Sequence, residues 1–251
     1  MTTAPLFLVD DVAALPAPGA ETLLDGAEGR HAATVRRLRP GEPLVLSDGR
    51  GGLAYGEVAG VAGKDALSVR LTAVSHVPAP AVRIVVAQAL VKGDRGELAV
   101  ETATEAGADA FLPWKAARCV TRWDDGPRGA KALERWRSTV REAAKQARRP
   151  WQPAVDEPVT TRQLAQRIAT ADVALVLHES AGAGLADVDL PAGGEVLLAV
   201  GPEGGVDDQE LDQLADAGAV PVRMGPEVLR ASTAACVALG ALAVRTGRWN
   251  R

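Results

Sequence analysis

Two turns rich in glycine and proline lie late in the chain and have the composition of a ligand site. The first covers residues 201–205 (GPEGG), the second covers residues 224–226 (MGP), and each follows a short apolar run. Glycine removes side-chain bulk and permits positive φ, so a ligand can lie directly against the backbone. Two such turns at the ends of successive strands predict one pocket built largely from main-chain groups.

The acidic residues beside the first turn indicate which kind of ligand charge the site favours. Glu203, Asp207 and Asp208 place carboxylates at the start of the helix expected to follow. Phosphate sites use an uncrowded helix N-terminus and usually add cations, so this position disfavours a pyrophosphate and favours a cationic or zwitterionic ligand. Tight turns with an ordinary acidic helix cap explain the same residues equally well, and physical reasoning alone leaves both interpretations open.

Strands and helices must hold the first turn in place. Residues 196–200 have the length and apolar composition of a buried strand. Asp207 and Glu210 form a capping-box pattern, which predicts a helix through Leu211 and Leu214. The first turn is therefore expected to connect a strand to a helix.

The second turn has a similar setting. Residues 219–223 predict another short strand, and Ser232 or Thr233 is expected to cap an alanine-rich helix that ends near Arg245. Arg230 falls between the turn and the cap, so the backbone on both sides restricts it.

The net charge of −4 is distributed unevenly along the chain. Residues 1–82 carry a net charge of −2, residues 83–150 carry +5 and residues 151–251 carry −7. Binding to a polyanion depends on where cations cluster rather than on their sum. The middle segment is therefore the candidate for contact with a nucleic acid.

Two basic segments are candidates for that contact. Residues 131–148 predict the strongest helix of the chain, with apolar residues on one face and arginine and lysine on another. Trp151 follows this helix and is expected to stack on a base or, as is commoner, to be buried. Residues 30–41 predict a phosphate-contacting patch, because arginine matches phosphate geometry, with a solvated basic helix as the ordinary alternative.

The pattern of elements changes about a third of the way along the chain. Residues 6–73 have the pattern of a small β domain, in which Asp48 and Gly49 join two strands of a hairpin. Residues 75–80 contain two prolines and have linker composition. From residue 81 onward apolar strands alternate with helices, which predicts a mostly parallel α/β sheet.

The bulk composition excludes several classes of protein. The chain is 47% hydrophobic but only 3% aromatic, so we expect a core of aliphatic residues and alanine. Residues 1–12 lack the pattern of a signal peptide, and no apolar stretch is long enough to cross a bilayer. Cys119 and Cys236 suffice for neither a disulfide framework nor a metal cluster. We therefore expect a soluble, cytoplasmic protein without a metal.

The motifs GPEGG and VLRASTAA, in this order near the C-terminus, resemble the S-adenosylmethionine site of the SPOUT methyltransferases. More narrowly they are similar to those of the RsmE family, which methylates N3 of a uridine in 16S ribosomal RNA. The segments KGDRGELAVETATEAGADAFLPWKAARCV and REAAKQARRPWQPAV are similar to the corresponding segments of that family. The chain departs from the family's frequent LRxETA pattern, because Ser232 stands where many members carry a glutamate.

The resemblance implies an α/β fold class with two domains. A PUA-like β-barrel domain that binds RNA would occupy residues 1–74, a linker residues 75–81, and a SPOUT-type α/β domain with a trefoil knot residues 82–251. The resemblance also implies S-adenosylmethionine as cofactor, 16S ribosomal RNA or the small ribosomal subunit as partner, and a homodimer.

The resemblance further implies roles for individual residues. Arg230 would stabilise the anion that forms on the uridine, because a guanidinium stays protonated, while Glu203 is a candidate proton acceptor and Glu142 a candidate neighbour. The expected cofactor-binding residues are Leu177, His178, Glu179, Val200, Gly201, Pro202, Gly204, Gly205, Met224, Gly225, Val228, Leu229, Arg230 and Ser232. The expected RNA-binding residues are Arg30, His31, Arg36, Arg37, Arg39, Lys92, Arg141, Lys145, Gln146, Arg148 and Arg149.

Three alternative functions stay open on the sequence alone. A SPOUT enzyme could act on a transfer RNA or on a base or ribose of 23S ribosomal RNA. A nucleotide-binding dehydrogenase fits less well, because the first turn is acidic, lies late in the chain and lacks GxGxxG spacing. A non-enzymatic RNA-binding module would leave the paired glycine turns without a purpose.

Overall fold

The computed structural model describes residues 4–250, and the chain divides into two compact units. Unit 1 comprises Met1–Ala79 with Ala144–Gln152, and unit 2 comprises Pro80–Ala143 with Pro153–Arg251. The segment Ala144–Gln152, which the sequence assigned to the second domain, therefore groups with unit 1. Each unit has its own hydrophobic core.

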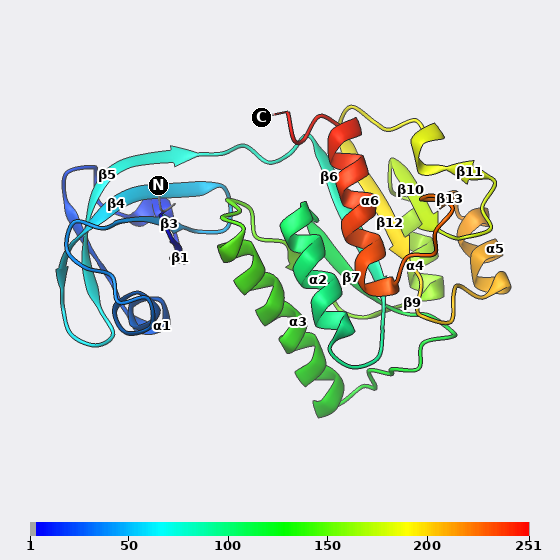
Figure 1. Cartoon of the computed structure of the whole chain (residues 1–251), viewed down its shortest axis with the longest axis horizontal. Helices are drawn as coiled ribbons and strands as arrows, with labels where there is room; N and C mark the ends of the chain where they lie inside the picture. Colours follow the sequence, from blue (N-terminus) through cyan, green and yellow to red (C-terminus); the bar gives the residue numbers. More distant parts are fainter. Residues whose placement is uncertain (1–3, 251) are drawn as a thin grey trace. The chain divides into compact units, whose positions relative to one another are not determined.

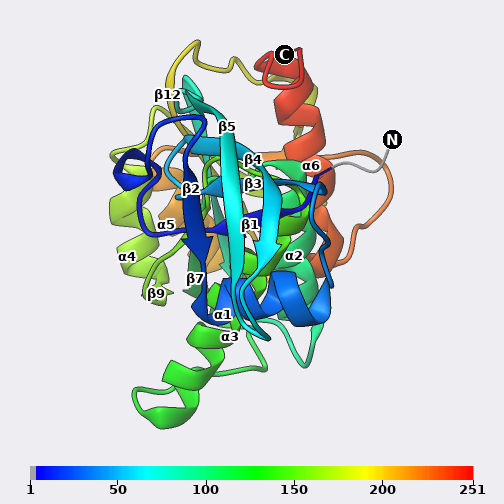
Figure 2. The same cartoon turned by 90° about the vertical axis from the view of Figure 1, so that its left-hand side faces the viewer.

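Unit 1 is built on a five-stranded sheet with the order β1-β3-β4-β5-β2 (Figure 2). Strand β1 is parallel to β3, and the other neighbours are antiparallel. Apolar residues of these strands, among them Phe7, Leu44, Leu46 and Leu67, form the core, so the predicted small β domain is confirmed. The strands are β1 Leu6–Leu8, β2 Glu21–Leu24, β3 Pro43–Ser47, β4 Gly52–Val61 and β5 Leu67–His76.

The helical segments of unit 1 are short. A 3₁₀ turn, η1, covers Val12–Ala14, and helix α1, Gly26–Arg30, continues into a π-helical segment, η2, at His31–Val35. The backbone then turns, with Arg37 at a φ of +54°. The basic run therefore begins in a helix and ends in an exposed turn, rather than forming one helix as its spacing suggested.

The predicted linker begins later than its composition indicated. Ser75 and His76 still belong to β5, because they pair with Leu53 and Gly52 of β4. The next residue, Val77, also hydrogen-bonds to the β3–β4 connection, through its backbone N–H and the carbonyl oxygen of Gly51 at 2.8 Å.

Unit 2 contains an eight-stranded sheet with the order β11-β13-β10-β12-β6-β7-β8, and β9 also pairs with β7 (Figure 1). All of these pairs are parallel, as the alternation of strands and helices predicted. Strand β12 lies between β10 and β6, and its residues 196–199 are fully buried because both faces of the sheet are covered. The strands are β6 Val82–Ala89, β7 Ala110–Lys115, β8 Ala154–Val155, β9 Val159–Thr160, β10 Val173–Leu177, β11 Ala183–Gly184, β12 Gly194–Val200 and β13 Ala219–Arg223.

Helices flank this sheet. Helix α6 packs on β6, β12 and α2, which lies beside it in Figure 1, and α4 packs on α5. Helix α3 begins at Pro127, a favourable first helical residue, and ends at Gln146, so it starts and stops earlier than predicted. The helices are α2 Arg95–Ala106, α3 Pro127–Gln146, α4 Thr161–Ile168, α5 Asp208–Asp216 and α6 Ala231–Arg245, with a 3₁₀ turn, η3, at Leu185–Asp187.

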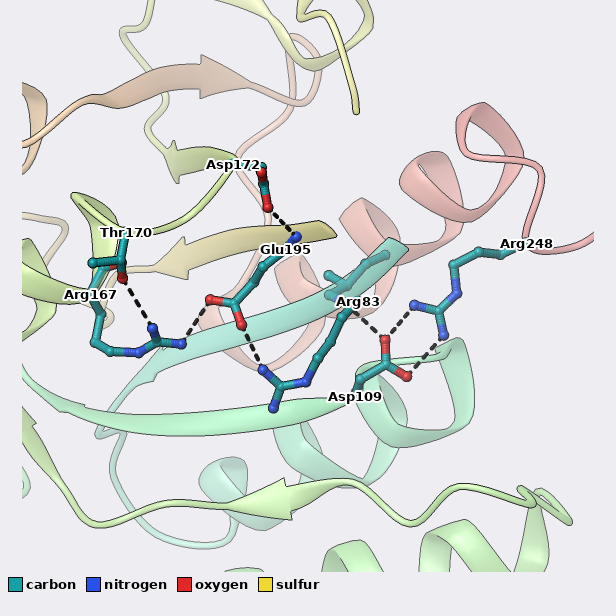
Figure 3. Close-up of polar contacts among 8 residues, drawn as sticks. Arg83, Asp109, Arg167, Thr170, Asp172, Glu195 and Arg248 are labelled. Atoms are coloured by element: carbon teal, nitrogen blue, oxygen red, sulfur yellow. Dashed lines mark hydrogen bonds and ion pairs between the residues drawn. The ribbon is translucent and has the colours of Figure 1, made fainter. Parts of the chain in front are cut away.

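An ion-pair network joins the amino ends of neighbouring strands in unit 2 (Figure 3). Glu195 of β12 accepts hydrogen bonds from Arg83 Nη1 at 2.6 Å and from Arg167 Nη2 at 2.7 Å. Its backbone N–H donates to Asp172 Oδ2 at 2.7 Å. The start of β12 is thereby linked to β6, to α4 and to the connection between α4 and β10.

The end of the described chain is anchored at the same edge of the sheet (Figure 3). Arg248 donates through Nη2 to Asp109 Oδ1 at 3.0 Å and through Nη1 to the carbonyl oxygen of Val82 at 3.1 Å. Asp109 also accepts from the backbone N–H of Ile84 at 2.9 Å. The Arg248 and Asp109 side chains are only 13% and 9% exposed, so this ion pair links the segment after α6 to the start of β7 within the protein interior.

Candidate functional site

A cavity of about 600 Å³ opens at the carboxyl ends of β10, β12 and β13 in unit 2. Its wall comprises the last residues of these strands, both glycine turns and the first turn of α6. The carboxyl ends of parallel strands are where open α/β sheets bind ligands. We call it the strand-end cavity.

The strand-end cavity brings together every residue that the sequence proposed for a cofactor. The fourteen positions come from three segments of the chain, and all of them line the cavity, as do the candidate catalytic residues Arg230 and Glu203. These residues are Leu177, His178, Glu179, Val200, Gly201, Pro202, Gly204, Gly205, Met224, Gly225, Val228, Leu229, Arg230 and Ser232.

The first turn requires its glycines. Gly205 has a φ of +75°, and its backbone N–H donates to the carbonyl oxygen of Pro202 at 2.9 Å. A Cβ atom at Gly201 would approach Val206 Cγ2 to 2.7 Å, closer than real Cβ atoms come to their neighbours. The backbone of the turn thus lies at the cavity wall without intervening side chains.

Arg118, which the sequence did not single out, holds this turn in position. Its Nη1 donates to the carbonyl oxygen of Gly204 at 3.2 Å, and its Nη2 donates to Asp207 Oδ2 at 3.1 Å. A Cβ atom at Gly204 would lie 3.3 Å from Arg118 Cβ, so glycine also allows this close approach. No local pattern marks Arg118, because its partners lie more than eighty residues away in the sequence.

The predicted capping box of α5 is half wrong. Asp207 is the N-cap and accepts from the backbone N–H of Gln209 at 3.1 Å, as expected. Glu210 instead is buried, where Oε1 accepts from the backbone N–H of Ala117 at 2.9 Å and from the Thr161 hydroxyl. Glu210 thereby fixes the residue that precedes Arg118, so it supports the first turn indirectly.

The prediction for the start of α6 was also wrong in one respect. The N-cap is Arg230, whose carbonyl oxygen accepts from the backbone N–H groups of Thr233 and Ala234, both at 2.9 Å. Ser232 lies inside the first turn of the helix and is 4% exposed. The N-cap position therefore belongs to Arg230, and in the described part of the chain no side-chain hydrogen bond caps α6.

The end of β10 is held to β13. The backbone N–H of His178 donates to the carbonyl oxygen of Val222 at 2.9 Å, which places the residues after both strands side by side. The His178 ring makes a hydrogen bond between Nδ1 and the Ser180 hydroxyl at 2.9 Å. The backbone of His178 is thus positioned by β13, and its ring is positioned by a local contact.

The charge of the strand-end cavity is balanced rather than acidic. Asp207, which contributed to the acidic expectation, forms an ion pair with Arg118. The sequence reasoning also missed Arg95, which faces the cavity from the start of α2 and has its Nη1 3.7 Å from Glu203 Oε1. The charged lining consists of three guanidinium groups and three carboxylates, from Arg95, Arg223, Arg230, Glu179, Glu203 and Glu227.

Other predicted site residues lie elsewhere. Glu142 is exposed on α3 and is not part of the cavity lining. Lys92, in the connection between β6 and α2, lines an adjoining hollow and donates through its backbone N–H to Glu203 Oε1 at 3.2 Å. Arg141, Gln146 and Arg148 have exposed side chains, and Arg149 is half-buried.

Lys145 does not belong to an exposed basic face, contrary to prediction. Its side chain is 7% exposed, and Nζ lies 3.0 Å from Glu28 Oε1 and 3.5 Å from His31 Nδ1, all within unit 1. His31 itself is half-buried and meets the Phe7 ring edge-on. By contrast, the side chains of Arg30, Arg36, Arg37 and Arg39 are all exposed.

Trp151 is also used within unit 1. Its Nε1 donates to the carbonyl oxygen of Val77 at 2.9 Å, and its ring meets His76 edge-on. The ring is only half-buried, and its stacking on a base or ribose stays a prediction.

Both cysteines are free thiols. Burial raises the pKa of Cys119 above its usual value, and burial with the nearby Glu105 carboxylate does the same for Cys236. Within residues 4–250 no three His, Cys, Asp or Glu side chains come together in a group that could hold a metal ion. No helix in that range is both long and apolar enough to span a membrane.

Comparison with known proteins identifies the family. Residues 78–243 match the RNA methyltransferase domain family, and residues 24–72 match the RNA methyltransferase PUA domain family. Over 249 residues the chain is 53% identical to the ribosomal RNA small subunit methyltransferase E of Mycobacterium bovis, covering 98% of this chain and 93% of that protein. The chain belongs to the RsmE family.

Two solved structures resemble this RsmE-family chain over its length. A Legionella pneumophila protein with bound S-adenosylmethionine has a TM-score of 0.85 at 28% identity, covering 97% of this chain and 98% of that one. The ribosomal RNA small subunit methyltransferase E of Neisseria gonorrhoeae, also bound to S-adenosylmethionine, has a TM-score of 0.85 at 25% identity with the same coverage. The predicted fold class, a PUA-like domain followed by a SPOUT-type α/β domain, is confirmed. The trefoil knot stays a prediction.

Proposed function

We propose that this RsmE-family chain methylates N3 of a uridine in 16S ribosomal RNA, with S-adenosylmethionine as the methyl donor. The observation that carries the proposal is the strand-end cavity, whose lining includes all fourteen residues expected to bind the donor. The relatives named for small-subunit ribosomal RNA support the choice of substrate. Because ribosomal RNA is the substrate, we place the reaction in the cytoplasm.

The residues of the strand-end cavity suit S-adenosylmethionine. A volume of about 600 Å³ lies in the usual range for small-molecule sites. Leu177, Met224 and Leu229 offer apolar surface to an adenine ring, and the glycine turns allow contact with the backbone. The balanced set of carboxylates and guanidinium groups matches a ligand that carries two cationic groups and one carboxylate.

When bound, S-adenosylmethionine would supply an electrophilic methyl group on a sulfonium. The chain then has to align the uridine with that group and manage one proton, because N3 is a poor nucleophile while protonated. Arg230 stabilises the negative charge that spreads over N3 and the two carbonyl oxygens. Glu203 accepts the N3 proton and passes it to water, while the Lys92 backbone N–H fixes its carboxylate. We retain Glu142 only as a candidate neighbour, since it lies outside the cavity lining.

We further propose that the PUA-like domain, predicted at residues 1–74 and continuing in the structure to the end of β5 at His76, binds RNA. The linker to the domain at 82–251 follows it. The exposed guanidinium groups of Arg30, Arg36, Arg37 and Arg39 support this role, and the half-buried His31 completes the set. Outside that domain the proposed RNA contacts are Lys92, Arg141, Gln146, Arg148 and Arg149.

A homodimer is also part of the proposal. The alanine face of α6 is not free for a partner, because Ala234, Ala235 and Ala238 are buried within unit 2. Val237, Val244 and Trp249 are instead 47%, 61% and 58% exposed at or beyond this helix. These residues are the apolar surface that we expect a second copy to cover, and light scattering measures the mass.

The test is the transfer of labelled methyl to purified RNA. Free 16S ribosomal RNA, small subunits, 23S ribosomal RNA and transfer RNA are compared side by side, and the modified nucleotide is mapped. We expect label only at N3 of a uridine in 16S ribosomal RNA, free or assembled. Label in another RNA would favour a different SPOUT activity, and calorimetry without S-adenosylhomocysteine binding would contradict the donor site.

A further inference from the structure

A second hollow adjoins the strand-end cavity within unit 2. We call it the side hollow, and its lining includes Lys92, Asp94, Arg95, Leu98, Val120 and Glu203. Arg95 and Glu203 line the strand-end cavity as well, so one ion-paired wall faces both spaces. A ligand in the side hollow would therefore lie next to a ligand in the cavity.

The side hollow combines two aliphatic side chains with a polar wall. Leu98 of α2 and Val120, in the segment after β7, are 44% and 75% exposed, which is unusual for large apolar residues placed together at a hollow. The polar wall is formed by Arg95 and Glu203, which present guanidinium N–H groups and carboxylate oxygens. A flat ligand with apolar faces and a polar edge has the matching chemistry.

We propose that the side hollow receives the uracil base that is to be methylated, an inference that rests on the proposed function. The ring faces lie against Leu98 and Val120, and the edge that carries N3 faces Arg95 and Glu203. One uracil carbonyl oxygen accepts from the Arg95 guanidinium, and N3–H donates to the Glu203 carboxylate beside it. Because Glu203 also lines the strand-end cavity, N3 is then turned toward the methyl donor.

The same wall selects uracil over cytosine. Cytosine N3 carries no hydrogen and is an acceptor, so it would face the Glu203 carboxylate acceptor to acceptor, with no donor between them. Leaving a buried acceptor without a donor weakens binding more than losing an ordinary contact does. Glu203 is thus a specificity-determining residue as well as the proposed proton acceptor.

Saturation-transfer NMR tests the site directly, with uridine monophosphate and cytidine monophosphate as probes and the full chain saturated with S-adenosylhomocysteine. We expect transfer to the uridine probe, little to the cytidine probe, and loss of the uridine signal in Val120→Asp. The Glu203→Gln variant should lose the preference, because an amide offers a donor to cytosine N3. Equal signals from both probes in the wild type, or an undiminished uridine signal in Val120→Asp, would overturn the inference.

Kinetics with 16S ribosomal RNA give a second readout. We expect Val120→Asp to lower kcat/KM for RNA by about tenfold or more, because a carboxylate is poorly tolerated against an apolar ring face. S-adenosylhomocysteine affinity should stay within about twofold of wild type, since Val120 is absent from the strand-end cavity. Val61→Asp is the matched control, because Val61 is also an exposed valine, at 53%, but lies at the end of β4 in unit 1.

The two proposals fail in different ways. If the wild type binds uridine selectively but transfers methyl to no RNA, the proposed function is wrong and the uracil site stands. If it methylates 16S ribosomal RNA while Val120→Asp keeps its full kcat/KM, the proposed function stands and the side hollow does not hold the base.

Discussion

Arg230 combines an exposed guanidinium with a fixed backbone. Its carbonyl oxygen caps α6 through the N–H groups of Thr233 and Ala234, so the origin of the side chain is set by the helix. The side chain itself lines the strand-end cavity without serving as a cap. At this scale the backbone supplies rigidity and the side chain supplies charge, which is the arrangement that electrostatic catalysis requires.

Replacing Arg230 by alanine should therefore affect turnover more than binding. We expect Arg230→Ala to lower kcat by about 100-fold or more, the usual cost of losing one positioned donor, with the Kd for S-adenosylhomocysteine nearly unchanged. Methyl-transfer kinetics and calorimetry measure the two quantities. Arg230→Lys keeps a positive charge and should recover part of the rate, whereas equal losses in both quantities would mean that Arg230 shapes the pocket.

For Arg118 we expect the opposite result, in which a substitution affects binding of the methyl donor more than turnover. Without its hydrogen bonds to Gly204 and Asp207 the first turn loses its support, so Arg118→Ala should raise the Kd for S-adenosylhomocysteine by about tenfold, equivalent to ~1.4 kcal/mol. Calorimetry measures the change, and Arg118→Lys should restore part of it. Arg122→Ala, at an exposed arginine of the same segment, is the matched control. A normal Kd in Arg118→Ala would show that the turn is stable by itself.

Local sequence predicted the residues of the site that follow one another along the turns, and it failed for those that come from elsewhere. The glycine turns were visible because backbone conformation is encoded locally. Arg95 and Arg118 were missed, and Lys145 was misplaced, because each has a partner more than eighty residues away in the sequence. Helical spacing predicts on which face of α3 Lys145 lies, but it does not predict that Lys145 forms an ion pair with Glu28.

At the scale of elements, strands were predicted better than helix ends. The strand predicted at residues 219–223 is β13, and the one predicted at 196–200 lies within β12, because the central residues of buried parallel strands form short apolar runs. The starts of two helices were predicted less well. Glu210 makes a buried contact with Ala117 instead of completing the capping box of α5, and the N-cap of α6 is Arg230, which caps through its backbone. Tertiary contacts decide such cases, since a cap contributes only about 1 kcal/mol.

The ion pair between Arg248 and Asp109 anchors the segment that follows α6, and its removal should weaken the whole of unit 2. We expect Arg248→Ala to lower the free energy of unfolding by about 3 kcal/mol, because it removes a positive charge from beside the nearly buried Asp109 carboxylate. Urea titration followed by circular dichroism measures the loss. Asn250→Ala, at an exposed residue two positions later, should change stability by less than ~0.5 kcal/mol. A similarly small change in Arg248→Ala would contradict the anchoring role.

At the scale of the whole molecule, charge is separated along the chain although the total is negative. The strand-end cavity draws on the acidic last part of the sequence, yet its own lining is balanced by arginines from other segments. Exposed arginines of unit 1, at residues 30–39, lie in a part of the chain whose net charge is slightly negative. The net charge of each segment therefore predicted only part of the proposed RNA-binding surface. It did not indicate the arginines at residues 30–39, and it counted Lys145, whose charge is paired with Glu28.

Reversing one of these charges tests the surface. Arg36→Glu should weaken binding to 16S ribosomal RNA and reduce the slope of log K against log salt by about 0.9, the value for one phosphate contact. Fluorescence anisotropy over a series of salt concentrations measures both. Arg162→Glu makes the same change at an exposed position of α4 and should leave the slope unaltered. An unchanged slope in Arg36→Glu would remove that residue from the RNA-binding surface.

The position of β12 between β6 and β10 sets when a newly made chain can complete its sheet. Strand β6 leaves the ribosome about a hundred residues before β12, whereas β10 ends shortly before it, so β6 in particular has one unpaired edge until residues 194–200 emerge. The first turn of α6, which closes the strand-end cavity, comes later still. Nascent chains are thus exposed to misassembly until residues 194–200 have been made, and a growing polypeptide can complete the strand-end cavity only after the first turn of α6 has also emerged.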